Sequence, residues 1–185
     1  MDGAVKVLGV GQNAKTDAYI RTYFKKQKLK TRVLVMEEGG DPIRWNQEIL
    51  LPAQWPLLTK RIVLEVMDED PLGDETVGSI LLDKKKIIEG HYKDKYVWKN
   101  IYGSPMNLKN SQAKREMNSN PDIASNWKGR VLLKIDCKKT DKPVAKVLSI
   151  KQEEVAKAAI YTKPKDYKVF AEIGQGIALP SEMKY

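Results

Sequence analysis

The sequence of 185 residues has little cysteine and little histidine, with one residue of each. A single cysteine excludes an internal disulfide and a zinc site built from several cysteines, and it is typical of a reducing compartment. A single histidine excludes a metal site with several histidine ligands. The chain also lacks any apolar run near the ~18 residues of a membrane-spanning helix. We therefore expect a soluble, cytoplasmic protein.

Acidic residues are outnumbered, because 24 Asp and Glu stand against 33 Lys and Arg, which gives a formal net charge of +9. A charge of this size favours anionic partners, namely acidic lipid, nucleic acid or acidic protein. Nucleic acid is the least favoured of the three, since the basic residues have no interleaved aromatic residues and no helix-turn-helix or RRM signature is present.

Short segments with the pattern of β-strands occupy the first hundred residues. In the segment 61–67, Ile62, Leu64 and Val66 alternate with their neighbours, which is the period of a strand with one wetter face. The predicted strands are residues 20–24, 29–36, 45–51, 61–67, 77–82, 97–101 and 128–136. Short strands with turn signals between them predict an all-β, antiparallel sandwich.

Residues 104–126 interrupt this pattern, because they are polar and include two prolines. We expect them to form a flexible surface insertion within a sandwich domain that covers residues 1–137.

The tail, residues 138–185, begins with a basic linker. Ser149 and Gln152 have the spacing of a capping box, which predicts a short helix that ends near residue 159. Residues 166–173 have the pattern of one more strand.

The most concentrated charge in the chain is acidic, since five of the eight residues from 68 to 75 are Asp or Glu. Crowded carboxylates repel one another unless a cation neutralises them, and oxygen ligands from a loop suit Ca²⁺. The spacing does not match an EF-hand loop. Two interpretations stay open: a calcium-binding loop, and a solvated loop that keeps the protein soluble.

A basic segment without acidic residues lies between residues 18 and 36. Its charged residues are Arg21, Lys25, Lys26, Lys28, Lys30 and Arg32. If residues 28–32 form a strand, Lys28, Lys30 and Arg32 share one face. Such a row can contact lipid phosphates, at about 1 kcal/mol per cation near an anionic membrane. The alternative is a solvated face that protects the edge of a sheet.

Residues that could support catalysis have no partners nearby in the sequence. His91 lies in a charged stretch, and Cys137 ends a predicted strand without a neighbouring His or Asp. We therefore expect a protein that is not an enzyme.

Four segments, in the correct order, resemble successive parts of a C2 domain. Residues 16–19 (TDAY) resemble the Ser-Asp-Pro-Tyr step into that family's second strand, and residues 28–33 resemble its lysine-rich strand. Residues 41–47 (DPIRWNQ) resemble its Asn-Pro-x-Trp-Asn-Glu turn, and residues 66–70 with Gly78 resemble its third calcium loop. The resemblance implies a Greek-key β-sandwich.

Within this family the chain is most similar to the third C2 domain of ferlins. The similar segments are residues 45–56, 101–105 and 128–133, and residues 169–176 are similar to a ferlin segment further downstream. Ferlins are large proteins with several C2 domains that act in vesicle fusion and membrane repair. The resemblance implies a fragment or reduced relative of such a protein, peripheral to membranes in the cytoplasm.

In C2 domains, carboxylates from two loops at one end of the sandwich share Ca²⁺ ions that bridge to acidic phospholipid. Carried over by position, the resemblance implies these metal ligands: Asp17, Asp68, Asp70 and Glu75, with Asp74 as a further candidate for the last position. The first ligand of the first loop stays open. Residues 1–2 align with it if the family's first strand is absent, and Asn13 takes its place if residues 4–9 form that strand.

The leading interpretation is a non-enzymatic module that binds acidic phospholipid membranes in trafficking or fusion, with Ca²⁺ as its expected cofactor. The expected membrane contacts are Lys26, Lys28, Lys30, Arg32 and Leu72, the last at the tip of the acidic loop. The alternative is a scaffold that binds protein partners through the insertion and the tail, without Ca²⁺. Nucleic acid is not an expected partner.

Overall fold

The computed structural model describes residues 16–24, 27–36, 42–52 and 61–163. Four sequence predictions lie outside these ranges and stay predictions. They are the first strand at residues 4–9, the first metal ligand at residues 1–2 or Asn13, the tail strand at residues 166–173 and the membrane contact at Lys26.

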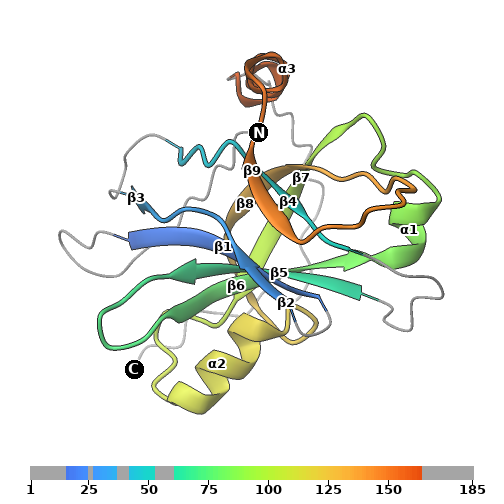
Figure 1. The fold of residues 1–185 in the computed structure, drawn as a ribbon. Helices are drawn as coiled ribbons and strands as arrows, with labels where there is room; N and C mark the ends of the chain where they lie inside the picture. The colour runs from blue at the N-terminus through green and yellow to red at the C-terminus, as the bar shows by residue number, and fades with distance from the viewer. Residues whose placement is uncertain (1–15, 25–26, 37–41, 53–60, 164–185) are drawn as a thin grey trace, which may run out of the picture.

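The described residues form an antiparallel β-structure with three short helices (Figure 1). The elements are β1 (Thr16–Phe24), β2 (Gln27–Lys30), β3 (Leu34–Met36), β4 (Gln47–Leu50), β5 (Arg61–Asp68), β6 (Glu75–Asp83), α1 (Lys84–Ile88), β7 (Tyr96–Gly103), α2 (Ser111–Ser119), β8 (Asn126–Lys134), β9 (Lys146–Ser149) and α3 (Gln152–Thr162). One sheet has the order β2-β1-β5-β6-β7-β8, with β3 also paired to β1, and β4 pairs with β9 in a second sheet. The predicted all-β, antiparallel fold is confirmed.

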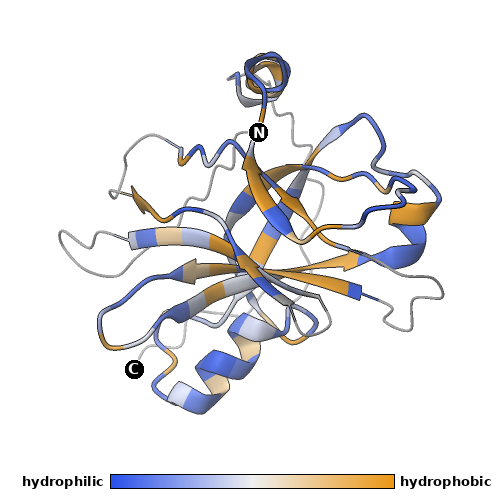
Figure 2. Ribbon diagram, viewed as in Figure 1, coloured by the Kyte–Doolittle hydropathy of each residue, from blue (hydrophilic) through white to orange (hydrophobic). Residues whose placement is uncertain are grey.

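The large sheet folds back on itself between β6 and β7. These two strands share a single pair in the described residues, Ser79 with Tyr102. Apolar side chains from both halves, such as Ile20, Val66 and Val131, meet in one buried cluster. Figure 2 shows hydrophobic residues along the central strands and hydrophilic residues in the loops. Each fully buried large apolar side chain contributes about 1.5–3 kcal/mol, so this core holds the two layers together.

The predicted strand at residues 29–36 is interrupted at residues 31–33, which separate β2 from β3. Thr31 is buried, and its hydroxyl accepts a hydrogen bond from the backbone N–H of Ile20 at 2.9 Å. This side-chain bond takes the place of a ladder bond at that position. The prediction that Lys28, Lys30 and Arg32 follow one strand is therefore wrong for Arg32, which lies beyond the end of β2.

The insertion at residues 104–126 contains helix α2, which was not predicted from the sequence. Asn110 caps the helix, because its side chain accepts hydrogen bonds from the backbone N–H groups of Gln112 and Ala113. Near the other end, Asn118 is 4% exposed and its side chain bonds to the backbone of Thr76 and Ser104. These bonds attach α2 to β6 and to the end of β7.

The described part of the tail, residues 138–163, also packs on the sheets. Strand β9 pairs with β4, and Ala158 of α3 packs against Leu132 and Tyr96 on the outer face of β7 and β8. The predicted helix is present. The predicted capping box is wrong, because Lys151 is the N-cap residue and makes no side-chain capping bond.

Glu154 joins α3 to the sheet. Its carboxylate accepts hydrogen bonds from Lys134 Nζ at 2.9 Å, from Lys157 Nζ at 2.7 Å and from the Tyr96 hydroxyl at 2.8 Å. These bonds, that from Lys134 most of all, lower the pKa of Glu154 from 4.5 to about 2. A carboxyl group whose pKa is lowered by folding stabilises the fold above its unfolded pKa, and this stabilisation is lost as the pH falls through the folded value.

We therefore expect the thermal midpoint of the wild type to fall more steeply than that of Glu154→Gln as the pH is lowered from 4.5 to 2. The measurement is thermal unfolding followed by circular dichroism at a series of pH values. Glu153→Gln is the matched control, since Glu153 is an exposed neighbour on the same helix. Parallel curves for the wild type and Glu154→Gln would contradict the assignment.

Candidate functional site

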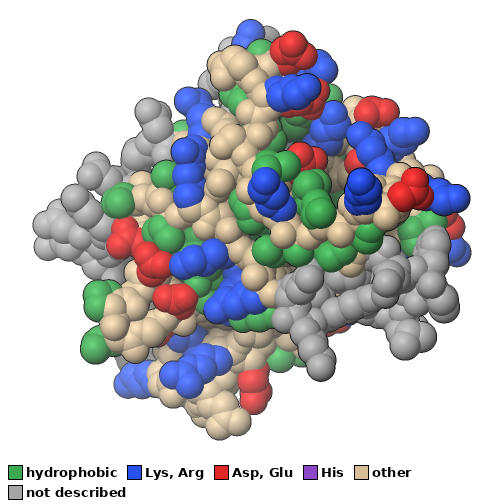
Figure 3. Space-filling view, in the orientation of Figure 1, with side chains coloured by type: hydrophobic (Ala, Val, Ile, Leu, Met, Phe, Trp, Pro, Cys, Tyr) green, Lys and Arg blue, Asp and Glu red, His purple; other side chains and the backbone are tan. Residues whose placement is uncertain are grey.

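The acidic loop connects β5 to β6 at one end of the sandwich. The loop turns at Gly73, whose φ of +130° is a backbone conformation that glycine adopts readily. The N–H of Gly73 donates to the Asp70 carbonyl at 2.9 Å. Leu72 stands at the tip and is 100% exposed. In Figure 3, acidic and hydrophobic side chains gather at the left edge of the molecule, with Lys and Arg side chains beside them toward the middle of the face.

The structure brings four of the predicted carboxylates into one neighbourhood. Strand β1 lies against β5, and the backbone N–H of Asp17 donates to Asp68 Oδ1 at 2.9 Å. The pKa of Asp68 is raised, mainly by burial and further by the charges of Asp17, Asp70 and Glu75. Because each negative charge disfavours the next, this end of the sandwich attracts positive charge.

Asp74 does not belong to this neighbourhood, which corrects its place among the predicted ligands. Its carboxylate accepts a hydrogen bond from the Tyr19 hydroxyl. That bond lowers the pKa of Asp74, with smaller contributions from Lys30 and Lys28. The pKa of Tyr19 rises to about 12, first through burial and then through Asp74. Asp74 therefore faces Lys28 and Lys30 of β2 rather than the other carboxylates.

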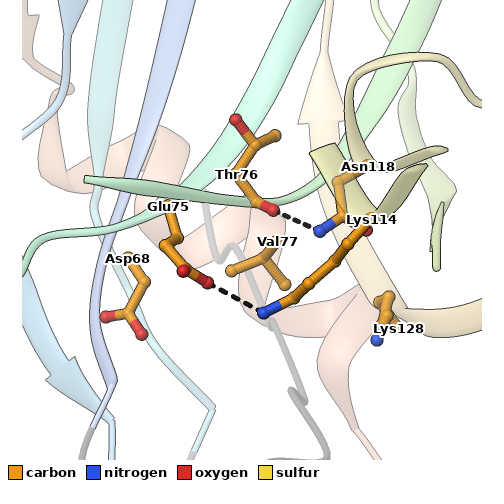
Figure 4. A pocket seen from close by; sticks show the side chains of 7 residues that line it. All are labelled: Asp68, Glu75, Thr76, Val77, Lys114, Asn118 and Lys128. Carbon is orange, nitrogen blue, oxygen red and sulfur yellow. Dashed lines mark hydrogen bonds and ion pairs between the residues drawn. The ribbon is translucent and has the colours of Figure 1, made fainter. Parts of the chain in front are cut away.

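Glu75 is paired with a lysine of the insertion. Lys114 Nζ on α2 lies 3.0 Å from Glu75 Oε2. Both side chains border a shallow pocket of about 120 Å³. The residues that line it are Asp68, Glu75, Thr76, Val77, Lys114, Asn118 and Lys128 (Figure 4). The pocket thus holds two lysines as well as two carboxylates. The pKa of Lys128 is lowered by burial and by the charge of Lys114.

The arrangement does not fit a calcium site. Within the described ranges, no group of three or more His, Cys, Asp or Glu side chains is arranged to hold a metal ion. Calcium takes six to eight oxygen ligands. Here Glu75 is directed to Lys114 and Asp74 to Tyr19, which leaves Asp17, Asp68 and Asp70 of the predicted set. The calcium site is therefore not realised among the described side chains.

The basic strand lies beside the acidic loop. Lys28 and Lys30 on β2 are exposed. Lys30 Nζ lies 3.0 Å from Glu69 Oε1 and 4.8 Å from the centre of the Tyr19 ring. Arg32 points elsewhere, since its guanidinium donates to the Arg44 carbonyl at 3.1 Å. The structure thus places two of the predicted membrane contacts next to the loop that carries Leu72.

Two residues that shape this site, Lys114 and Lys128, were not predicted from the sequence. Lys114 belongs to the insertion, which has no strand pattern, and Lys128 lies just after it. Asn110 at the start of α2 was the available signal for the helix, because asparagine is a favoured N-cap residue. No local signal indicates that Lys114 meets Glu75, which is 39 residues away in the sequence.

The remaining candidates are surface residues. His91 is exposed and lies 3.3 Å from Glu89, and Cys137 is an exposed free thiol. In the described part of the chain, no helix is both long enough and apolar enough to pass through a bilayer.

Comparison with known proteins agrees with the fold. The model of the family described as "C2 domain" matches residues 3–99. Two rice proteins, each called "GTPase activating protein 1", one from Oryza sativa subsp. indica and one from subsp. japonica, are each 34% identical over 82 residues. The match covers 44% of this chain and 47% of each relative, so the chain spans about half the length of these curated relatives. With a family match over more than half of its residues and an antiparallel sandwich to accompany it, the chain belongs to the C2 domain family.

Proposed function

We propose that this C2 module binds acidic phospholipid membranes through β2 and the tip of the acidic loop. C2 domains generally bind membranes or proteins and do not catalyse reactions. The observation that supports the proposal is the fully exposed Leu72 on a loop that Lys30 joins to the basic strand. An apolar tip beside exposed lysines can insert into the head-group layer while the lysines contact lipid phosphates.

The charges of the loop decide how such docking works. An acidic membrane surface repels acidic side chains, so the loop can approach the membrane only where cations offset its carboxylates. Lys30 offsets Glu69, and Lys114 offsets Glu75, both within 3.0 Å. Lys28 has no acidic residue opposite it on β1, where it pairs with Tyr23. The attraction is electrostatic and therefore falls as salt is added.

Vesicle co-sedimentation tests the proposal. We expect the protein to pellet with vesicles of phosphatidylcholine and phosphatidylserine, and not with phosphatidylcholine alone. The double variant Lys28→Gln, Lys30→Gln should weaken binding about 30-fold, on the basis of about 1 kcal/mol per cation. The experiment is run in calcium, in chelator and across a salt series.

The double variant Lys85→Gln, Lys86→Gln is the matched control. It removes the same net charge from exposed lysines of α1. An equal loss in both double variants would show attraction by net charge alone, and would rule out β2 as the docking surface. Binding that requires calcium in the wild type would restore the original calcium prediction for this end of the sandwich.

Protein binding is the second candidate, and an aromatic surface favours it. Tyr102 on β7 and Trp127 on β8 lie opposite each other and are 37% and 45% exposed. Beside them the Arg130 guanidinium stacks on Trp98 at 4.2 Å. The rice relatives are called GTPase activating proteins, and such an activity requires a protein partner. A module of this second kind would pellet with neither vesicle.

The finer roles expected from the sequence remain proposals. A ferlin-like role in membrane trafficking or fusion, at a cytoplasmic membrane surface, is compatible with acidic-membrane binding. The two rice relatives are not named as ferlins, so they support the C2 domain and not that narrower resemblance.

A further inference from the structure

We propose that Lys114 is a built-in counter-cation, which occupies the end of the sandwich in place of a divalent ion and makes the module independent of calcium. The inference concerns the protein in solution. It therefore does not depend on the membrane binding proposed above.

The first observation is the position of the ammonium group. Lys114 Nζ lies 3.0 Å from Glu75 Oε2, and Asp68 borders the same pocket. Figure 4 shows Lys114 extending from α2 toward Glu75, with Asp68 on the far side of Glu75. The charge of Glu75 also acts on Asp68, whose neighbours Asp17 and Asp70 add to the repulsion. The ammonium group of Lys114 thus lies where it offsets the repulsion between these carboxylates.

The second observation is that the helix that carries Lys114 is held in place. Asn118 lies one helical turn after Lys114, on the same face of α2. Its amide Nδ2 donates to the Thr76 carbonyl and its Oδ1 accepts from the Ser104 N–H, both at 2.7 Å. Since Thr76 directly follows Glu75, the bond to Asn118 sets α2 at the distance that the ion pair requires. The backbone of α2 is therefore held where the Lys114 side chain can reach Glu75.

The third observation is a second cation. Lys128 lines the same pocket, and its pKa is lowered by burial and by Lys114. No carboxylate bonded to Lys128 is present among the described residues. A divalent ion that enters would meet the repulsion of both lysines, and it would also have to displace Lys114 from Glu75.

Calcium titration of a small set of variants tests the inference. Lys114→Gln removes the charge from an exposed ion pair, with side chains 42% and 63% exposed, so we expect the variant to fold. We expect it to bind calcium about tenfold more tightly than the wild type, because one repelling charge and one competing partner of Glu75 are gone. Isothermal titration calorimetry gives the affinity, and the rise of the thermal midpoint with added CaCl₂ gives an independent measure.

Two further variants separate this role from a general change in charge. Lys114→Arg keeps the cation and should match the wild type. The double variant Lys114→Gln, Glu75→Gln loses the freed carboxylate and should bind calcium no better than the wild type. The inference is overturned if Lys114→Gln gains no affinity, if Lys114→Arg gains as much, or if the wild type already binds calcium as tightly as Lys114→Gln.

Discussion

Replacing Asn118 by alanine is expected to destabilise the protein by about 2–5 kcal/mol, because it leaves one buried and one partly buried backbone group without partners. The Ser104 N–H would lose its bond to Asn118 Oδ1, and the Thr76 carbonyl would lose its bond to Nδ2, both at 2.7 Å. Ser104 is 0% exposed and Asn118 is 4% exposed, so water replaces the bond to Ser104 poorly. Urea denaturation followed by circular dichroism measures the change.

The loss of stability should depend on the buried side chain of Asn118 and not on any substitution at the end of α2. Ser119→Ala is the matched control, since Ser119 is the exposed next residue of α2 and should change stability by no more than about 0.5 kcal/mol. Hydrogen exchange adds a local readout, with faster exchange expected in α2 and around Ser104. A loss below about 1 kcal/mol for Asn118→Ala would mean that α2 is not fastened by this residue.

Replacing Gly78 by alanine is expected to cost about 3 kcal/mol, the upper end of the range for overpacking. A Cβ at this position would lie 2.5 Å from Ile101 Cγ2 and 2.6 Å from the carbonyl oxygen of Tyr102. Ile101 is 0% exposed and the oxygen belongs to the backbone, so neither can move aside without shifting β7. Gly78 precedes Ser79, whose pairing with Tyr102 joins β6 to β7.

Gly90→Asn is the control for the loss of a glycine. Gly90 has a φ of +74°, and the nearest atom to a Cβ there is Lys93 Cβ at 3.8 Å. Asparagine adopts this left-handed conformation more readily than other residues, so we expect a cost under about 1 kcal/mol. Urea denaturation of both variants gives the comparison. Equal costs would show that backbone freedom, rather than the close approach of β7, explains the need for glycine at position 78.

Strands with a clear alternation were predictable from the sequence. Ile62, Leu64 and Val66 repeat at every second position, and β5 follows with bounds that differ by one residue from the predicted 61–67. Alternation is a local property, because neighbouring side chains of a strand point to opposite faces whatever the strand packs against. Helices α1 and α2 and strand β9 were missed, since each is too short to show a sustained apolar period.

The candidate site was predicted only in part. The acidic loop follows from local composition, and the resemblance to C2 domains implied that Asp17 lies near Asp68. The structure shows both. The partners of the carboxylates did not follow. Asp74 meets Tyr19 and Glu75 meets Lys114, and these partners are 55 and 39 residues away along the chain.

The sequence by itself determined that the chain forms an antiparallel β-sandwich with a concentrated acidic loop, because periodicity and local composition are properties of consecutive residues. Only the tertiary structure decided which charges meet. Lys114 reaches Glu75 because Asn118 fastens α2 beside β6. That placement depends on hydrogen bonds and packing between segments distant in sequence, which no local pattern encodes.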